Sequence, residues 1–351
     1  MTQLQPDASA RVADSTIDRA LLAVEGLTTA FPVAGRLAPA VDDVSFEVRR
    51  GETLGLVGES GSGKSLTAFS ILRLVPPPGQ MTSGRIWFDG LDLSALGESD
   101  MREIRGARIG LILQEPMSAL NPVMTIGDHI AETLVVHGRA GWSAARRQAA
   151  EWLDAVKVPD PERRARDYPH QLSGGQRQRV LIAMALACQP SLIIADEPTT
   201  ALDVTIQAQV LELLGSLKTQ FNLSLLLITH DLGVVAHSAD RVAVMYAGRI
   251  VEQGTVRDVF RNPLHPYTRG LMASLPRGAA GSRLQAIEGT VPPLAEPLGG
   301  CAFAPRCPAR FALCDRSAPP PIQAEPRREV RCFLHGDTPG VEPSVLSSPQ
   351  P

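Results

Sequence analysis

The spacing of apolar residues along the chain predicts strands first, then helices, then an alternation of the two. Between residues 21 and 88, short β-rich runs such as LLAVEGL and VDDVSFEV are separated by Gly, Pro and Asp turns, which is typical of strands. From about residue 99 to residue 168 the chain is charged and its apolar positions recur at helical spacing, as in AARRQAAEWLDAV. We therefore expect a β-rich start followed by an inserted helical subdomain.

The second half of the pattern predicts a parallel sheet. A helix is expected from Ser173 to Gln189, where Pro190 stops it, and another after Asp203, which is a suitable helix cap. The runs SLIIADEP and LSLLLITH are apolar without alternation, as in parallel strands that are buried on both faces. Strands and helices that alternate in this order indicate an α/β fold.

The ends of the chain differ from its folded body. Residues 1–20 lack the basic start and apolar run of a secretory signal, and we expect them to form a disordered arm. Beyond about residue 240 come short strands, a helix-like run and a Pro- and Gly-rich stretch with four cysteines, so we expect a C-terminal region over residues 256–336. Residues 337–351 have too little apolar content to fold and are expected to be a disordered tail.

Composition narrows the class of protein. The 351 residues carry a formal net charge of −3, with 44% hydrophobic and 20% charged residues, which is typical of a soluble globular protein and not of a nucleic-acid-binding polycation. No apolar run reaches the roughly 18 residues of a membrane-spanning helix, and the richest is VLIAMALAC at residues 180–188. We expect a cytosolic protein that binds no nucleic acid.

The segment GESGSGKS contains the phosphate-binding pattern G-x-x-x-x-G-K-[ST], in the context that this pattern requires. It follows the strand-like run TLGLV and precedes the helix-like run LTAFSILRL, although a plain Gly-rich turn is the alternative. Glycines let the backbone aim N–H groups at phosphate oxygens, the lysine adds a point charge, and the last serine can bind Mg²⁺. The candidate nucleotide-binding residues are Gly58, Glu59, Ser60, Gly61, Ser62, Gly63, Lys64 and Ser65.

Polar residues at the ends of three other strand-like runs complete a candidate site for phosphoryl chemistry. Asp196 would hold Mg²⁺, and Glu197 is placed to orient or deprotonate a water that attacks a γ-phosphate. His230 would hydrogen-bond the γ-phosphate and the water, and Gln114 would ligate Mg²⁺ or the water. Taken singly, each of these residues is also common as a structural or surface residue.

A helix start in the stretch LSGGQ, at residues 172–176, predicts a second anion-binding site. Two glycines behind a serine expose backbone N–H groups at the start of a helix, and such groups bind anions. The residues concerned are Ser173, Gly174, Gly175 and Gln176. One nucleotide does not need two phosphate sites, so this stretch requires a separate explanation.

The motifs together resemble those of the ATP-binding cassette (ABC) ATPases over about residues 20–255. The resemblance rests on the order and approximate spacing of the phosphate loop, Gln114, LSGGQ, IIADEP, ALD at 201–203, and His230. It implies a P-loop NTPase (RecA-like) core with an antiparallel β subdomain. The nucleotide-binding domain would span residues 21–255, with the helical subdomain at about 99–175.

The same resemblance implies ATP and Mg²⁺ as cofactors and ATP hydrolysis as the activity. In that family two domains pair head to tail, and the LSGGQ stretch of one closes over the ATP held by the phosphate loop of the other. Asp203 would lie at the same dimer seam. An aromatic residue before the first strands stacks on adenine in the family, and Phe31, with Val41 beside it, is the matching candidate.

The C-terminal sequence narrows the resemblance further. NPLHPYTRGLMASLP, IEGTVPPL and GCAFAPRCPARFALC resemble the ATP-binding subunits of bacterial oligopeptide and dipeptide importers and of their nickel-uptake relatives. This implies a peripheral protein on the cytoplasmic face of the inner or plasma membrane. The implied partners are a second, paralogous ATPase, two membrane permeases that contact EPMSALNP at 115–122, and, indirectly, a periplasmic or lipid-anchored solute-binding protein.

The four clustered cysteines predict a metal site. Five, six and seventeen residues separate them, which fits neither common zinc knuckles nor bacterial ferredoxins. Four thiolates nevertheless suit either a [4Fe–4S] cluster or Zn²⁺. Because some relatives with this pattern carry an iron–sulfur cluster, a structural [4Fe–4S] cluster is the favoured expectation, zinc the alternative, and free thiols the third possibility. The residues are Cys301, Cys307, Cys314 and Cys332.

Other functions stay open on the sequence alone. A non-transport ABC ATPase would carry long coiled coils, two cassettes or a basic face, and none of these is present in the sequence. A metal- or substrate-sensing regulatory cassette is a second alternative, against which Glu197 and His230 argue. Within transport, the cargo may be nickel instead of peptide, and the ATPases may form a homodimer or a heterodimer.

Overall fold

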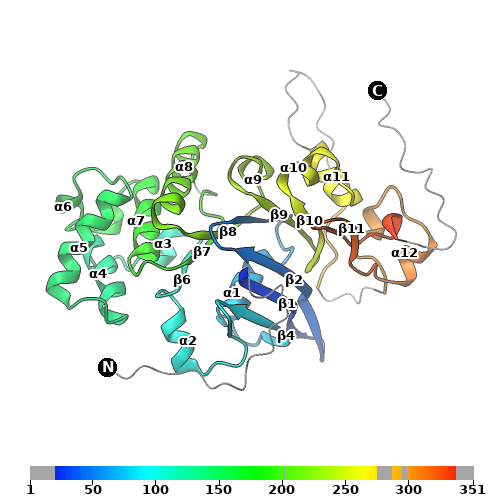
Figure 1. The fold of residues 1–351 in the computed structure, drawn as a ribbon, viewed down its shortest axis with the longest axis horizontal. Helices are drawn as coiled ribbons and strands as arrows, with labels where there is room; N and C mark the ends of the chain where they lie inside the picture. Colours follow the sequence, from blue (N-terminus) through cyan, green and yellow to red (C-terminus); the bar gives the residue numbers. More distant parts are fainter. Residues whose placement is uncertain (1–19, 201, 275–286, 295–298, 337–351) are drawn as a thin grey trace.

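Two sheets, one of four strands and one of eight, organise the described part of the chain in the computed structural model (Figure 1). The structure describes residues 20–200, 202–274, 287–294 and 299–336. The arm expected at residues 1–20, apart from Ala20, and the tail expected at 337–351 lie outside the described residues. Within the described part, no helix is both long enough and apolar enough to span a bilayer.

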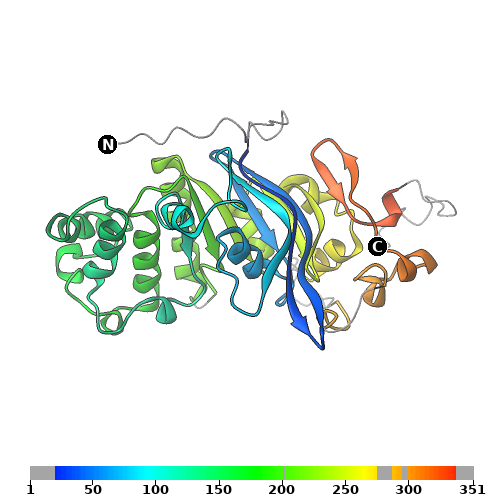
Figure 2. The ribbon, with the colours of Figure 1, turned by 90° about the horizontal axis from the view of Figure 1, so that it is seen from below.

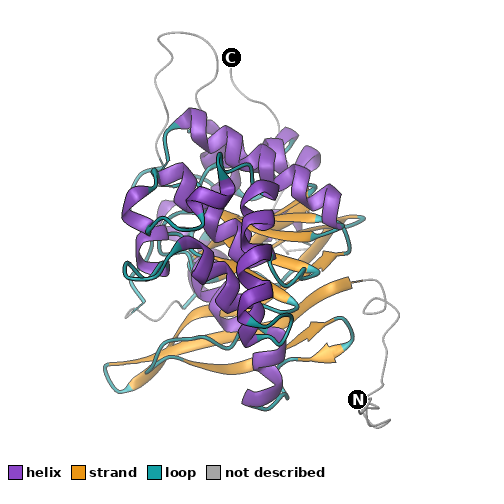
Figure 3. Ribbon diagram, turned by 90° about the vertical axis from the view of Figure 1, so that its left-hand side faces the viewer, coloured by secondary structure: helices purple, strands orange, loops and turns teal. Residues whose placement is uncertain are grey.

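The smaller sheet is antiparallel and is built around one long hairpin. The hairpin turn consists of Ala34 and Gly35, with φ of 49° and 80°, and left-handed turns of this kind match the twist of the flanking strands. The antiparallel β subdomain is therefore confirmed, and it forms a layer of its own (Figure 3). In spatial order its strands are β2 (Arg36–Arg49), β1 (Ala20–Val33), β4 (Gln80–Phe88) and β5 (Leu91–Asp92).

The larger sheet contains the predicted parallel core. Strands β9, β3, β8, β7 and β6 run parallel, and every residue of β3, β7, β8 and β9 is buried, which explains their unbroken apolar runs. In spatial order the strands are β11 (Ile322–Glu325), β12 (Arg328–Val330), β10 (Arg249–Thr255), β9 (Arg241–Tyr246), β3 (Thr53–Val57), β8 (Ser224–Thr229), β7 (Leu192–Asp196) and β6 (Ile109–Ile112).

Several helices gather at one end of the molecule, and one helix lies between the two sheets at its centre (Figure 2). Apolar side chains of α4, α5, α7 and α8 pack with those of β7 and β8, whereas α1 is buried between the two sheets. The helices up to residue 221 are α1 (Lys64–Ile71), α2 (Glu98–Ile104), α3 (Pro116–Ala119), α4 (Ile126–Val136), α5 (Trp142–Ala155), α6 (Pro161–Arg164), α7 (Gly174–Leu186) and α8 (Val204–Phe221).

The C-terminal region is joined to the main sheet and is not merely appended to it. Strand β12 pairs with β10 and so extends the eight-stranded sheet. A buried ion pair reinforces the junction, because an Arg328 nitrogen lies 3.0 Å from a Glu252 oxygen and neither side chain is more than 3% exposed. The later helices are α9 (Leu232–Ser238), α10 (Val256–Arg261), α11 (Pro266–Ala273) and α12 (Ala312–Arg316), with the short 3₁₀ turns η4 (Ala304–Arg306) and η5 (Phe333–His335).

Candidate functional site

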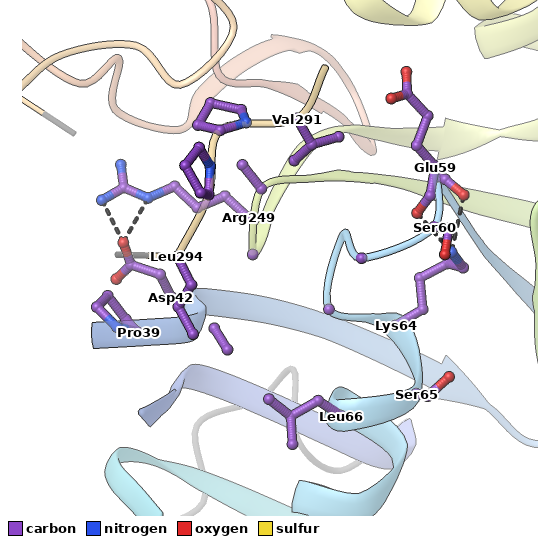
Figure 4. Close-up of a pocket in the computed structure, with 18 of the residues that line it drawn as sticks. Pro39, Asp42, Glu59, Ser60, Lys64, Ser65, Leu66, Arg249, Val291 and Leu294 are labelled. Atoms are coloured by element: carbon purple, nitrogen blue, oxygen red, sulfur yellow. Dashed lines mark hydrogen bonds and ion pairs between the residues drawn. The ribbon is translucent and has the colours of Figure 1, made fainter. Parts of the chain in front are cut away.

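A cavity of about 890 Å³ opens at the carboxyl ends of the parallel strands (Figure 4). Residues that follow four different strands line it: the phosphate loop, Gly58–Ser65, after β3; Gln114 after β6; Glu197 after β7; and His230 after β8. Ligands of open α/β sheets bind at this edge. The fold thus brings together side chains that are up to about 170 residues apart in the sequence.

The phosphate loop is shaped by close backbone contacts. A Cβ at Gly58 would lie 2.1 Å from the Met245 carbonyl oxygen, and Gly63 adopts a φ of 103°, so both positions require glycine. Gly63 caps α1 without a side-chain hydrogen bond, which leaves N–H groups of the first turn for an anion. Ser62 is the exception within the loop, because its side chain is fully buried and does not line the cavity, and its N–H donates to the Glu59 carbonyl oxygen at 3.2 Å.

Lys64 is held against its own loop. Its side chain is buried, and Nζ donates hydrogen bonds to the carbonyl oxygens of Gly58 at 2.9 Å and Glu59 at 3.0 Å. Burial lowers the pKa of Lys64, and the nearby carboxylates, Glu197 first among them, oppose that shift. A triphosphate in the cavity offers this ammonium group stronger acceptors than the two carbonyl groups.

Asp196 and Ser65 form a pair of oxygen donors at the bottom of the site. The Ser65 hydroxyl donates a hydrogen bond of 2.9 Å to an Asp196 carboxylate oxygen. Burial raises the pKa of Asp196 more than this hydrogen bond lowers it. A buried carboxylate beside a hydroxyl group matches the hard oxygen ligands that Mg²⁺ prefers, and a cation there would also stabilise the ionised carboxylate.

Glu197 is the centre of a polar cluster. Gln114 Nε2 donates to Glu197 Oε2 at 3.1 Å, the Thr200 hydroxyl donates to the same oxygen at 2.7 Å, and His230 Nδ1 lies 3.2 Å from Oε1. Burial alone would raise the pKa of Glu197, but the hydrogen bonds from Thr200 and His230 outweigh it and lower the pKa. The carboxylate is therefore ionised at neutral pH and able to accept a proton.

Two features of this cluster are not visible in the motif alone. Glu197 has a φ of 47°, a left-handed conformation that is uncommon for a residue other than glycine and that clusters at functional sites. Sequence reasoning also misses Thr200. Its only signal is a hydroxyl residue three positions after the glutamate, in DEPTT.

The LSGGQ residues do not reach the cavity of their own chain. They lie at the start of α7, where the Ser173 hydroxyl accepts a hydrogen bond from the Gln176 N–H at 3.3 Å and the Gln176 side chain accepts one from the Ser173 N–H at 3.0 Å. Asp203 caps the neighbouring helix α8 by accepting from the Ile206 N–H. A Cβ at Gly175 would lie 2.6 Å from Ile206, so the two helix starts are packed together. Ser173, Gly174 and Asp203 are exposed.

Phe31 and Val41, which were expected at the base of the nucleotide, do not line the cavity. Val41 is fully buried in the core between the sheets, and the Phe31 ring lies against Gly79. The cavity lining therefore gives their expected contact with adenine no support. The wall at that end is made instead by Pro39, by the ion pair between Asp42 and Arg249, and by residues 291–294 of the C-terminal region (Figure 4).

The four C-terminal cysteines surround one small cavity of about 20 Å³. Three aromatic residues, Phe303, Phe311 and Phe333, close it, and the Cys301 N–H donates to the Cys314 carbonyl group at 2.7 Å. Burial raises the pKa of Cys301, Cys307 and Cys332, the last to about 12. No group of three or more His, Cys, Asp or Glu in the described residues is arranged to hold a metal ion. The sulfurs therefore share a cavity, but not a ligand geometry. The fifth cysteine, Cys188, is buried in the core of α4, α5, α7 and α8.

Comparisons of the sequence give two family matches and many close relatives. The family described as ABC transporter matches residues 41–200, and that described as the C-terminal region of oligopeptide/dipeptide transporters matches residues 251–314. The dipeptide transport ATP-binding protein DppD of Bacillus subtilis is 50% identical over 329 residues, which cover 93% of this chain and 98% of the relative. The oligopeptide transport ATP-binding protein OppD of the same organism is 50% identical over 327 residues, 92% of this chain and 91% of the relative.

Solved structures share the fold. A dimeric, post-hydrolysis structure of an ATP-binding cassette bound to ADP and Pi has a TM-score of 0.59 at 28% identity, and covers 67% of this chain and 99% of its own. CbiO1 of Clostridium perfringens, part of an ABC transporter complex, has a TM-score of 0.59 at 26% identity, and covers 70% of this chain and 92% of its own. These likenesses confirm the α/β fold with a P-loop core.

Proposed function

Since this chain belongs to the ABC transporter family, and the relatives described above are ATP-binding proteins of peptide transport, we propose that it hydrolyses ATP to power uptake of di- and oligopeptides through separate permeases. The observation that carries the proposal is the cavity that joins the phosphate loop to Glu197 and His230, with Asp196 hydrogen-bonded to Ser65 of the same loop. The relatives described above are named for dipeptides and oligopeptides, so peptide is favoured over nickel.

We propose a role in hydrolysis for each of these side chains. The first turn of α1 and Lys64 would bind the β- and γ-phosphates. Ser65, Asp196 and, on rearrangement, Gln114 would hold Mg²⁺, which would offset phosphate charge. Glu197 accepts a proton from the water that attacks the γ-phosphate in line with the leaving oxygen. His230 and Thr200 keep the Glu197 carboxylate ionised and fix its direction.

The helix start at LSGGQ supports a head-to-tail pair with a second ATPase subunit. Ser173 and Gly174 are exposed and do not line the chain's own cavity, which leaves this helix start available to cover a nucleotide on a partner. Asp203 lies beside it and would meet the same seam. We propose a paralogous subunit as the partner, two permeases that rest on the surface after Gln114, and indirect action of a solute-binding protein. The complex would place this chain on the cytoplasmic face of the membrane.

The test of this function is reconstitution. Co-expressed with candidate permeases and a second ATPase of the same family, the chain should give proteoliposomes that take up a labelled di- or oligopeptide only when ATP is accessible to it and the solute-binding protein is present. Nickel uptake by the same vesicles is the competing result. A non-transport ATPase would hydrolyse ATP at a rate that neither permease nor peptide alters.

For the four cysteines we propose a [4Fe–4S] cluster, with Zn²⁺ as the alternative. The support for this proposal is the donor set, which consists of four sulfurs around one cavity closed by aromatic rings. Side chains must shift to become ligands, and metal binding would release protons. The group would order a Pro-rich segment and is assigned no part in hydrolysis.

Metal analysis of anaerobically purified protein decides between these possibilities. We expect broad visible absorption, with iron and acid-labile sulfide close to four per chain. Cys314→Ser should abolish the absorption, and Cys188→Ala, in the helical core, should retain it. One equivalent of zinc in a colourless protein would support the alternative. Metal-free protein with four titratable C-terminal thiols would overturn both.

A further inference from the structure

Arg306 connects the four-cysteine segment to the phosphate loop. It lies in η4, directly before Cys307, and its side chain is only 5% exposed. Its guanidinium nitrogens donate to both carboxylate oxygens of Glu59, at 3.0 and 3.2 Å. Such a forked pair fixes direction as well as distance. Glu59 is the second residue of the phosphate loop, 247 positions away in sequence.

The same guanidinium also holds the segment that walls the other end of the cavity. It donates to the carbonyl oxygens of Ile287 at 3.3 Å and Glu288 at 2.9 Å. A few residues later, positions 291–294 line the nucleotide cavity opposite the phosphate loop, and Figure 4 shows Val291 and Leu294 there. One side chain therefore fixes two separate walls of one cavity.

The Glu59 backbone is held from the same side. Its N–H donates to the Tyr267 hydroxyl at 3.0 Å, so binding phosphate through this N–H would require that bond to be exchanged. Tyr246, Tyr267 and Phe303 pack their rings together beneath the ion pair, with centroids 4.6 to 5.5 Å apart. The phosphate loop thus rests on a platform made largely by the C-terminal region.

The negative charge of Glu59 connects its ion pair with Arg306 to the binding of a nucleotide. A carboxylate next to a triphosphate repels it, and the repulsion grows as the surroundings exclude water. The guanidinium of Arg306 offsets that charge without being directed at the phosphates itself, because its hydrogen bonds go to Glu59, to the two carbonyl groups and to the Tyr246 hydroxyl.

We propose that Arg306 is a positioning residue for ATP, through which the cysteine segment sets both the charge of the phosphate loop and the place of the 291–294 wall. The proposal rests on the ATPase function proposed above. It assigns the C-terminal region a part in nucleotide affinity, and it predicts that ordering or disordering the cysteine segment changes the KM for ATP before it changes kcat.

The experiment compares full-length variants in Mg·ATP binding by calorimetry and in steady-state hydrolysis. Arg306→Met should raise the Kd and KM for ATP about tenfold while kcat changes less than threefold. Arg306→Lys keeps the charge but not the fork, and should raise KM about threefold. Adding Glu59→Gln to Arg306→Met should recover most of the lost affinity, because the unpaired carboxylate is gone. Arg310→Met, which breaks the exposed pair with Asp315 in the same segment, is the matched control.

Each outcome bears on the proposal. Parental Kd and KM in folded Arg306→Met would overturn it. So would a double variant weaker than the single one, since that result indicates a purely structural role. If Arg306→Met fails to fold, the Lys variant alone decides, by its KM against its kcat. Absence of ATP binding by the parent protein would instead refute the proposed function.

Discussion

Glu197→Gln should lower ATP hydrolysis by about 10²–10⁴-fold, the usual contribution of a general base. The amide has the shape of the carboxylate and retains one oxygen that can accept from Thr200, with its NH₂ group then facing His230, but it accepts no proton from water. ATP affinity should therefore persist, and ATP should accumulate in a closed pair of subunits. Phosphate release, ATP binding and size-exclusion elution, measured with and without ATP, report the three effects.

The matched control for this substitution is Glu212→Gln on the exposed part of α8, which should hydrolyse ATP at the parental rate. A Glu197→Gln variant with unreduced turnover would assign the base to another group. A variant that lost ATP binding together with turnover would show that the carboxylate acts on the nucleotide or its Mg²⁺ and not on the water.

Arg328→Met should destabilise the protein by about 3–5 kcal/mol, the cost of leaving a buried charge without its partner. Arg328 is the guanidinium partner of Glu252, whose other bonds come from the backbone N–H groups of Leu264 and His265. It also donates to the Asn262 carbonyl oxygen, so the substitution removes a hydrogen-bond donor from that group as well. The urea midpoint, followed by circular dichroism, should fall with little change in slope.

Two further variants separate charge from packing at this junction. Adding Glu252→Gln should recover about 1 kcal/mol or more, within the range of coupled neighbours, because the buried negative charge is removed. Arg327→Met, one position away and exposed in the turn, should stay within about 0.5 kcal/mol of the parent. Equal losses at positions 327 and 328 would mean that the sheet junction does not depend on the ion pair.

Local motifs carried most of what the sequence predicted. The phosphate loop, the parallel strands and the start of α7 depend on neighbours within a few residues, so spacing and periodicity identify them. The predicted helix from Ser173 differs from α7 only at its end, which is Leu186 and not Gln189.

What the sequence did not predict depends on contacts between distant segments. The joining of β12 to β10 depends on strands of three and seven residues and on a side-chain pair 76 positions apart, and no local pattern encodes it. The cavity wall at residues 291–294 also depends on contacts between distant segments, and so does the absence of Phe31 and Val41 from the cavity lining. In each case the burial of one face was decided by a partner from elsewhere in the chain.

The capping box at the start of α7 has a consequence for how two subunits meet. The Ser173 hydroxyl accepts a hydrogen bond from the Gln176 N–H, and its own proton can still be donated, so the proposed contact with a partner's γ-phosphate does not break the cap. Helix caps of this kind contribute about 0.5–2 kcal/mol. Because that contribution is kept with and without the phosphate, each subunit would meet and leave its partner with a helix start that is already formed.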